Sequence, residues 1–157
     1  MEVSAKLQWN NELRFTVEVA QGRKMELNAV EKMGRAFTPM ELFLVALAGC
    51  TAMDIQWIMC KQRQQVDKFE VLVKGTRREK DPRYYEEIDL EYIVEGPAIK
   101  RNAVERAIRL SQEEYCSVRA MLKDTVKLNT SYTIVERGLE QKFPYTSSSS
   151  NSKAQKG

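Results

Sequence analysis

The 157-residue sequence predicts an α+β domain with the element order β-β-β-α-β-β-α-β around one long buried helix. Two observations predict this class. Apolar and polar residues alternate within 2–19 and again within 69–95, which is the two-residue period of half-buried strands. Residues 42–50 are apolar without interruption, which favours a helix buried on every side.

The first third of the chain is expected to form an antiparallel meander. Apolar residues occupy every second position in 3–9 and in 13–19, and a short third strand follows at 25–27. Asn10-Asn11 and Gln21-Gly22 supply the turns, because Asn and Gly tolerate a left-handed backbone.

Three start signals then begin the long helix. Thr38 is a good N-cap, Pro39 suits the first helical position, and Glu41 closes a capping box back to Thr38. We expect the helix to end near Gln65. Its longest apolar run, 42–50, is too short to span a bilayer.

The next elements follow from the same patterns. Strands are expected at 69–74 and 88–95, separated by a charged loop that contains Asp81-Pro82. A second helix is expected to open at Asn102, with Glu105 completing another capping box.

The last third is expected to close the fold. A break at 115–117 precedes a helical turn at 118–123, and a closing strand follows at 131–135. The folded domain is therefore expected over 1–137. Residues 138–157 are polar and Ser-rich and are expected to be a disordered tail, because such a composition cannot repay its ordering entropy.

The apolar helix also predicts an assembly. Six strands and one further helix leave part of its surface uncovered, and a homodimer is the usual remedy. We therefore expect a dimer from burial alone.

Composition excludes several function classes. The chain has no histidine, which removes Ser-His-Asp and Cys-His catalysis, His-ligated zinc and His proton shuttles. Its net charge of +3, with acids and bases interspersed, is too weak and mixed to indicate nucleic-acid binding. Three cysteines without an N-terminal signal sequence predict a reduced, cytoplasmic protein with no membrane segment.

The cysteines decide the function. Cys50 follows Ala48-Gly49 inside the apolar helix, so a partner backbone or a small substrate could approach its sulfur; the alternative is a small buried hydrophobic residue. Cys116, at the break after the second helix, could likewise be a reactive thiol or a small structural residue. Cys60 lies about 15 Å further along the helix axis than Cys50 and is expected to be a bystander.

Two segments carry a family resemblance. Residues 38–54, TPMELFLVALAGCTAMD, resemble the first-cysteine motif of the OsmC/Ohr family of osmotically inducible and organic hydroperoxide resistance proteins. The segment Tyr115-Cys116-Ser117-Val118 resembles the second-cysteine motif of that family. The resemblance covers roughly 1–137 and is closest to a divergent OsmC-like branch.

The resemblance implies an intertwined homodimer with two active sites at the subunit interface. It implies an antioxidant, cysteine-based peroxidase of the oxidative stress response, with peroxiredoxin-like activity on organic hydroperoxides. Cys50 would be the peroxidatic cysteine and Cys116 the resolving one, and an external dithiol would reduce their disulfide. No metal or organic cofactor is implied.

The residues that would activate the thiol are less evident. The family's hydroperoxide-resistance branch uses a Glu and an Arg, and Met40 stands at that Glu position here. Glu41 is one residue later and has its own role in the capping box. The candidate arginines are Arg14, Arg23, Arg35 and Arg119.

Asp54 is a further charged neighbour of the first cysteine. It lies four residues after Cys50 on the same helix face, where a carboxylate would raise a thiol pKa or bind an arginine.

Two other functions stay open from the sequence. The fold could have kept inert cysteines in a non-catalytic, dimeric protein that binds apolar ligands. It could also be a redox sensor that signals through a Cys50–Cys116 disulfide.

Overall fold

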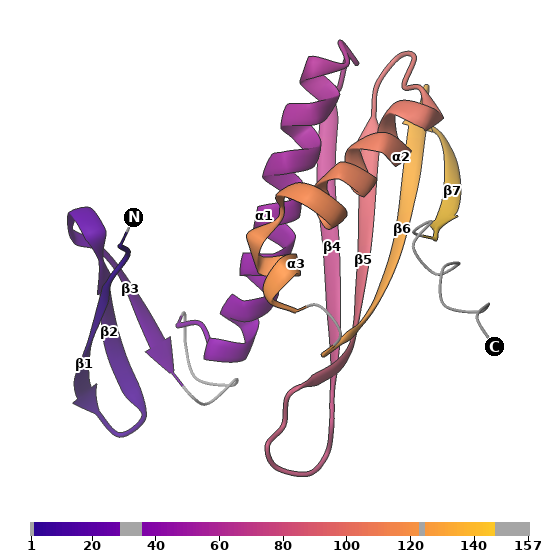
Figure 1. Ribbon diagram of the computed structural model, residues 1–157. Coiled ribbons are helices and arrows are strands. Elements are labelled where there is room, and N and C mark those ends of the chain that lie inside the picture. Colours follow the sequence, from indigo (N-terminus) through magenta and orange to yellow (C-terminus); the bar gives the residue numbers. More distant parts are fainter. Residues whose placement is uncertain (1, 29–35, 123–124, 147–157) are drawn as a thin grey trace, which may run out of the picture. The chain divides into compact units, whose positions relative to one another are not determined.

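A computed structural model describes residues 2–28, 36–122 and 125–146 (Figure 1). The chain divides into two compact units, Met1–Val45 and Ala46–Gly157, and each is described by itself. The long helix α1 (Pro39–Lys61) begins in the first unit and continues into the second.

The first unit contains the predicted meander. Strands β1 (Ala5–Asn11), β2 (Arg14–Val19) and β3 (Arg23–Asn28) pair antiparallel in that order. The short 3-10 helix η1 (Ala20–Gly22) forms the second turn. The first turn lies at Glu12, with a left-handed φ of 45°, and not at the expected Asn10-Asn11.

Helix α1 starts where its capping signals predict. The Glu41 carboxylate accepts hydrogen bonds from the Thr38 backbone N–H at 2.7 Å and from its hydroxyl at 3.0 Å. In return, the Glu41 N–H donates to Thr38 Oγ1 at 3.2 Å. The helix ends at Lys61 and not near Gln65, because Arg63 has a left-handed φ of 55° that no glycine signalled.

Within the second unit, α1 has one buried stripe, an exposed side and half-buried residues between them. Leu47, Thr51 and Ile55 are at most 1% exposed, whereas Met53 and Trp57 are 76% and 56% exposed. By length and composition alone, the whole helix is long and apolar enough to cross a membrane. The central helices of soluble proteins pass the same test.

The second unit contains a four-stranded sheet in the order β4-β5-β6-β7. Strands β4 (Lys68–Arg77) and β5 (Tyr85–Glu95) are antiparallel, whereas β5 and β6 (Lys127–Glu136) are parallel and are connected through the helical segment. Ile88, Leu90, Tyr92 and Val94 are buried on one face, as their alternation predicts.

The expected tail over 138–157 is corrected at its beginning. Residues Leu139–Tyr145 form strand β7, which pairs antiparallel with β6 through a turn at Arg137 and Gly138, both with positive φ. The strand is mostly exposed, so its sequence lacks the alternation of a half-buried strand; Phe143 nevertheless stacks on Tyr132 at 5.2 Å. Residues 147–157 lie outside the described part of the chain.

The helical segment between β5 and β6 has three parts. Helix α2 (Arg101–Leu110) continues into a π-helical turn, η2 (Ser111–Tyr115), and a short helix α3 (Ser117–Met121) follows. The expected capping box at Asn102 does not form, because the N-cap of α2 is Lys100, two residues earlier, and the helix begins at Arg101. Glu105 instead accepts hydrogen bonds from Arg101 and Tyr132.

Candidate functional site

The predicted break at 115–117 is built by the π-helical turn. The Cys116 N–H donates to the Ser111 carbonyl at 2.8 Å, a bond that spans five residues. Cys116 itself has an extended backbone, with φ −71° and ψ 104°, and so leaves the helical path. Turns of this kind occur often at functional sites, because they redirect one side chain out of a regular helix.

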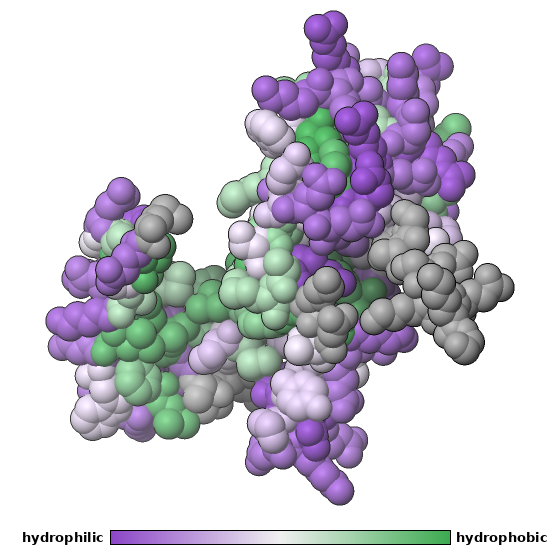
Figure 2. Space-filling view, viewed as in Figure 1, coloured by the Kyte–Doolittle hydropathy of each residue, from purple (hydrophilic) through white to green (hydrophobic). Residues whose placement is uncertain are grey.

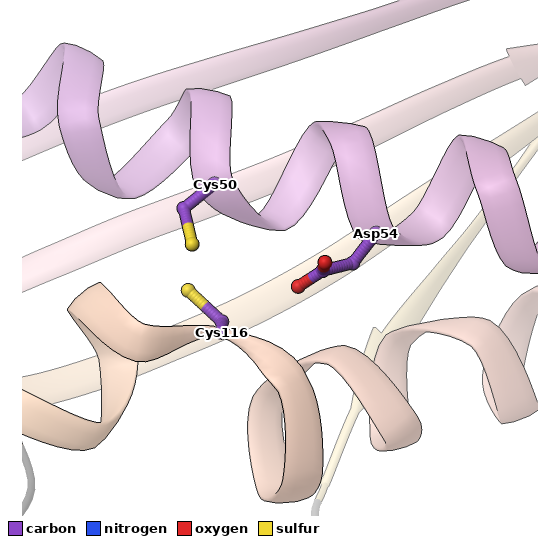
Figure 3. A group of neighbouring side chains, drawn as sticks. All are labelled: Cys50, Asp54 and Cys116. Atoms are coloured by element: carbon purple, nitrogen blue, oxygen red, sulfur yellow. The ribbon is translucent and has the colours of Figure 1, made fainter. Parts of the chain in front are cut away.

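Successive contacts place this break beside the middle of α1. Gln62 Nε2 donates to the Ala103 carbonyl at 2.9 Å, and Ser111 Oγ donates to Asp54 Oδ2 at 3.0 Å. As the chain advances through α2 and η2, the residue that it contacts lies nearer the N-terminal end of α1. The two segments therefore run antiparallel, and Cys116 lies opposite Cys50 (Figures 1 and 3).

Cys50, Asp54 and Cys116 meet in one cluster, which we call the dithiol site (Figure 3). Their two sulfur atoms and a carboxylate oxygen all lie within 4.8 Å of one another. Cys50 and Asp54 point from consecutive turns of α1 toward Cys116, which lies between η2 and α3. Both cysteines are free thiols. The site brings together the two cysteines that the sequence selected.

The two thiols differ in how deeply they are buried. Cys116 is 3% exposed, whereas Cys50 is half-buried. Burial raises the pKa of Cys116 to about 12, and a hydrogen bond with Cys50 and the charges of Cys50 and Asp54 act in the same direction. The Arg119 N–H donates to Cys116 Sγ at 3.3 Å and opposes this rise. Cys116 is therefore a protonated thiol at neutral pH.

The sequence did not single out Ser111 and Tyr92, although both belong to this neighbourhood. Ser111 is fully buried and orients the Asp54 carboxylate. The buried Tyr92 hydroxyl makes no hydrogen bond of ordinary geometry within the part of the chain described. Burial raises the pKa of Tyr92 to about 12; the neighbouring side chains of Thr51 and Gln112 oppose this rise, and the charges of Cys116 and Asp54 add to it. Only the π-helical turn reveals Ser111, and no sequence pattern marks that turn.

The predicted helper residues separate into three cases. The Glu41 carboxylate accepts hydrogen bonds from Thr38 in the helix cap, which lower its pKa. This structural role explains why an acidic residue stands at position 41. Arg14 and Arg23 are exposed at the starts of β2 and β3, and Arg35 lies outside the described residues. Arg119 contacts Cys116 through its backbone, while its buried Nε lacks a hydrogen-bond partner among the residues described.

The remaining cysteine lies apart from the cluster. Cys60 is exposed on α1 and is not one of the three groups that converge. Because Cys50 and Cys60 are about 15 Å apart along the helix, they cannot share a disulfide without unwinding it.

A cavity of about 300 Å³ borders the same elements, and its lining also includes Ile58 and the polar or charged Lys61, Gln62 and Arg106. Trp57, Leu110 and Tyr115 line it, and the Trp57 and Tyr115 rings meet edge to face with centroids 6.4 Å apart. Trp57 is three residues after Asp54, and Tyr115 immediately precedes Cys116. The cavity and the dithiol site are therefore formed by neighbouring residues of the same two segments.

Residues 32–131 match the family model described as OsmC-like protein. A curated relative, Protein YhfA of Escherichia coli strain K12, is 41% identical over 135 residues, which are 85% of this chain and 98% of YhfA.

Solved structures share the fold. A hypothetical protein from Aquifex aeolicus VF5 superimposes with a TM-score of 0.78 and 32% identity, covering 87% of this chain and 98% of that one. An organic hydroperoxide resistance protein OsmC from Legionella pneumophila superimposes with a TM-score of 0.66 and 17% identity, covering 84% and 96%.

Proposed function

The chain belongs to the OsmC-like protein family, and on that premise we propose that it is a thiol-dependent peroxidase that reduces organic hydroperoxides with Cys50 and Cys116. One observation carries the proposal. The two free thiols come from distant parts of the sequence, yet their sulfur atoms lie within 4.8 Å of each other. Cysteines kept only for packing have no need to converge in this way.

The reaction balances in two steps. The Cys50 sulfur attacks one oxygen of the peroxide, the O–O bond breaks, and an alcohol leaves while Cys50 becomes a sulfenic acid. The Cys116 thiol then displaces the hydroxyl group from that sulfur, which releases water and forms the disulfide. An external dithiol restores both thiols by exchange.

Burial supports the division of roles between the cysteines. The peroxide must reach the first sulfur, and Cys50 is the more exposed of the two. Cys116 is buried and protonated, which suits a thiol that reacts second with a sulfur already beside it.

The cavity beside the site supports an organic substrate. Trp57 and Tyr115 offer apolar and aromatic surface to a fatty or aryl group, whereas hydrogen peroxide has no group to place there. We therefore place cumene hydroperoxide and similar peroxides ahead of hydrogen peroxide as substrates.

The proposed enzyme is a cytoplasmic homodimer. Free thiols persist in a reducing compartment, which is also where an external dithiol is available. Apolar side chains gather on the first sheet and remain exposed in the single chain, with Leu7 at 55% and Trp9 at 63% (Figure 2). A second copy would cover them.

Turnover tests the proposal directly. With dithiothreitol as the reductant, consumption of cumene hydroperoxide should exceed that of hydrogen peroxide at equal concentration. Cys50→Ser should abolish turnover, and Cys60→Ser should retain it. Turnover that survives in Cys50→Ser, or that fails in the wild type with every thiol reduced, would contradict the proposal.

A further inference from the structure

We propose that the reduced dithiol site binds a thiophilic divalent cation, with Zn²⁺ as the best match, through Cys50 Sγ, Cys116 Sγ and the Asp54 carboxylate. The three groups come from two separate segments and converge within 4.8 Å. Thiolate and carboxylate are both ordinary zinc ligands, so the absence of histidine from the chain does not exclude this metal.

The spacing of the ligand atoms suits a tetrahedral ion. Zinc holds sulfur at about 2.3 Å and carboxylate oxygen at about 2.0–2.2 Å, so two ligand atoms of one ion lie about 3.5–4 Å apart. The observed upper limit of 4.8 Å requires closure by about 1 Å, which side-chain rotation at half-buried Cys50 and Asp54 can supply. Three protein ligands leave the fourth position for water.

Neighbouring groups already orient these ligands. Ser111 donates to Asp54 Oδ2 at 3.0 Å, which leaves Oδ1 for the cation, and the Arg119 N–H donates to Cys116 Sγ at 3.3 Å. Metal ligands are characteristically supported by hydrogen bonds of this kind.

Metal binding replaces the protons of the two thiols by the cation. One Zn²⁺ and two thiols give the zinc dithiolate and two released protons, with no change in oxidation state. The consequence of metal binding for peroxide reduction rests on the proposed function. A cation that shares the lone pairs of both sulfurs blocks attack on the peroxide and disulfide formation, so the zinc form is a protected, resting form.

Cobalt titration of the reduced, full-length protein tests the binding. One equivalent of Co²⁺ per chain should produce a thiolate-to-cobalt charge-transfer band, and Zn²⁺ should remove it. Cys50→Ser and Cys116→Ser should lose the band, and Cys60→Ser should keep it. Asp54→Asn should weaken binding about 10-fold or more. A wild type without the band, or one whose band depends on Cys60, would overturn the proposal.

Alkylation of the wild type provides a test that needs no variant. With Zn²⁺ present, iodoacetamide should label Cys60 and spare Cys50 and Cys116; equal labelling of all three would refute the site. This result is separate from peroxidase activity. Cobalt binding without turnover would contradict the proposed function alone, whereas turnover without cobalt binding would contradict the metal site alone.

Discussion

Asp54 is the acidic residue of the dithiol site, and its placement gives it a second role in the proposed reaction. A carboxylate oxygen of Asp54 lies within 4.8 Å of both sulfur atoms, and Ser111 donates a hydrogen bond to Asp54 Oδ2. Cys116 must lose a proton when it condenses with the sulfenic acid, although burial raises its pKa to about 12. We propose that Asp54 accepts that proton through one bridging water, or directly after a side-chain rotation.

Replacing Asp54 therefore separates the two chemical steps. In Asp54→Asn, the sulfenic acid on Cys50 should persist about 100-fold longer, the lower end of what a positioned base contributes. Quenching with dimedone followed by mass spectrometry measures its lifetime. Asp67→Asn changes an exposed acid beyond the end of α1 and should match the wild type. An unchanged lifetime in Asp54→Asn would remove Asp54 from the proton transfer.

Ser111 holds Asp54 and should matter for stability. Ser111→Ala removes a buried hydrogen bond to a carboxylate, so the free energy of unfolding should fall by about 1.5–3 kcal/mol. Urea denaturation monitored by circular dichroism measures the change. The exposed Ser117→Ala should stay within about 0.5 kcal/mol of the wild type, and equal losses in both variants would contradict the role of Ser111.

At the scale of elements, the sequence predicts strands that have one buried face and helix starts that are capped by side chains. The alternation of β5 identifies its buried face, and Thr38 with Glu41 identifies the start of α1. The exposed edge strand β7 lacks that alternation. The end of α1 depends on a left-handed Arg63 that no glycine marks.

The site could likewise be predicted only in part from the sequence. Cys50 and Cys116 emerge from their motifs, but their convergence depends on the π-helical turn, which has no sequence signal of its own. Ser111 and Tyr92 join the site only through tertiary packing.

The α1 cap makes a prediction about pH. Hydrogen bonds from the Thr38 backbone and hydroxyl lower the pKa of Glu41 below its ordinary value of 4.5. A lowered pKa stabilises the fold above the unfolded value, and this contribution disappears as the pH falls through the folded value. The stability difference between wild type and Glu41→Gln should therefore be present at neutral pH and vanish well below pH 4.5.

Removing the cap residue itself gives the matching comparison. Thr38→Ala should lower the free energy of unfolding by about 1 kcal/mol at neutral pH, the usual value of an N-cap hydroxyl. Denaturation at several pH values measures both variants. If the effect of Glu41→Gln does not change with pH, the carboxylate is not what stabilises the cap.

At the scale of the whole molecule, the apolar face of the first sheet is the surface that the proposed dimer would cover. Strand register places two apolar rows across β1, β2 and β3, namely Leu7, Val17 and Met25, and then Trp9, Phe15 and Leu27. Leu7, Trp9 and Met25 are all exposed in the single chain. A row of this kind on a monomer would favour aggregation, so the proposed dimer accounts for it.

A charge in that row should separate the subunits. Leu7→Lys should roughly halve the mass measured by light scattering after size-exclusion chromatography, while the circular dichroism spectrum stays unchanged. Gln8 points to the opposite face of the same strand, and Gln8→Lys should remain dimeric. A monomeric wild type, or a dimeric Leu7→Lys protein, would place the interface elsewhere or exclude it.

The pairing of Cys50 with Cys116 is the claim on which the proposed chemistry depends, and a disulfide map tests it most directly. Reduced wild-type protein is treated with one equivalent of cumene hydroperoxide, alkylated, and digested without reductant. We predict the loss of two hydrogen atoms from the intact chain, a peptide that joins Cys50 to Cys116, and an alkylated Cys60. A chain that stays fully reduced, or a disulfide that involves Cys60, would contradict it.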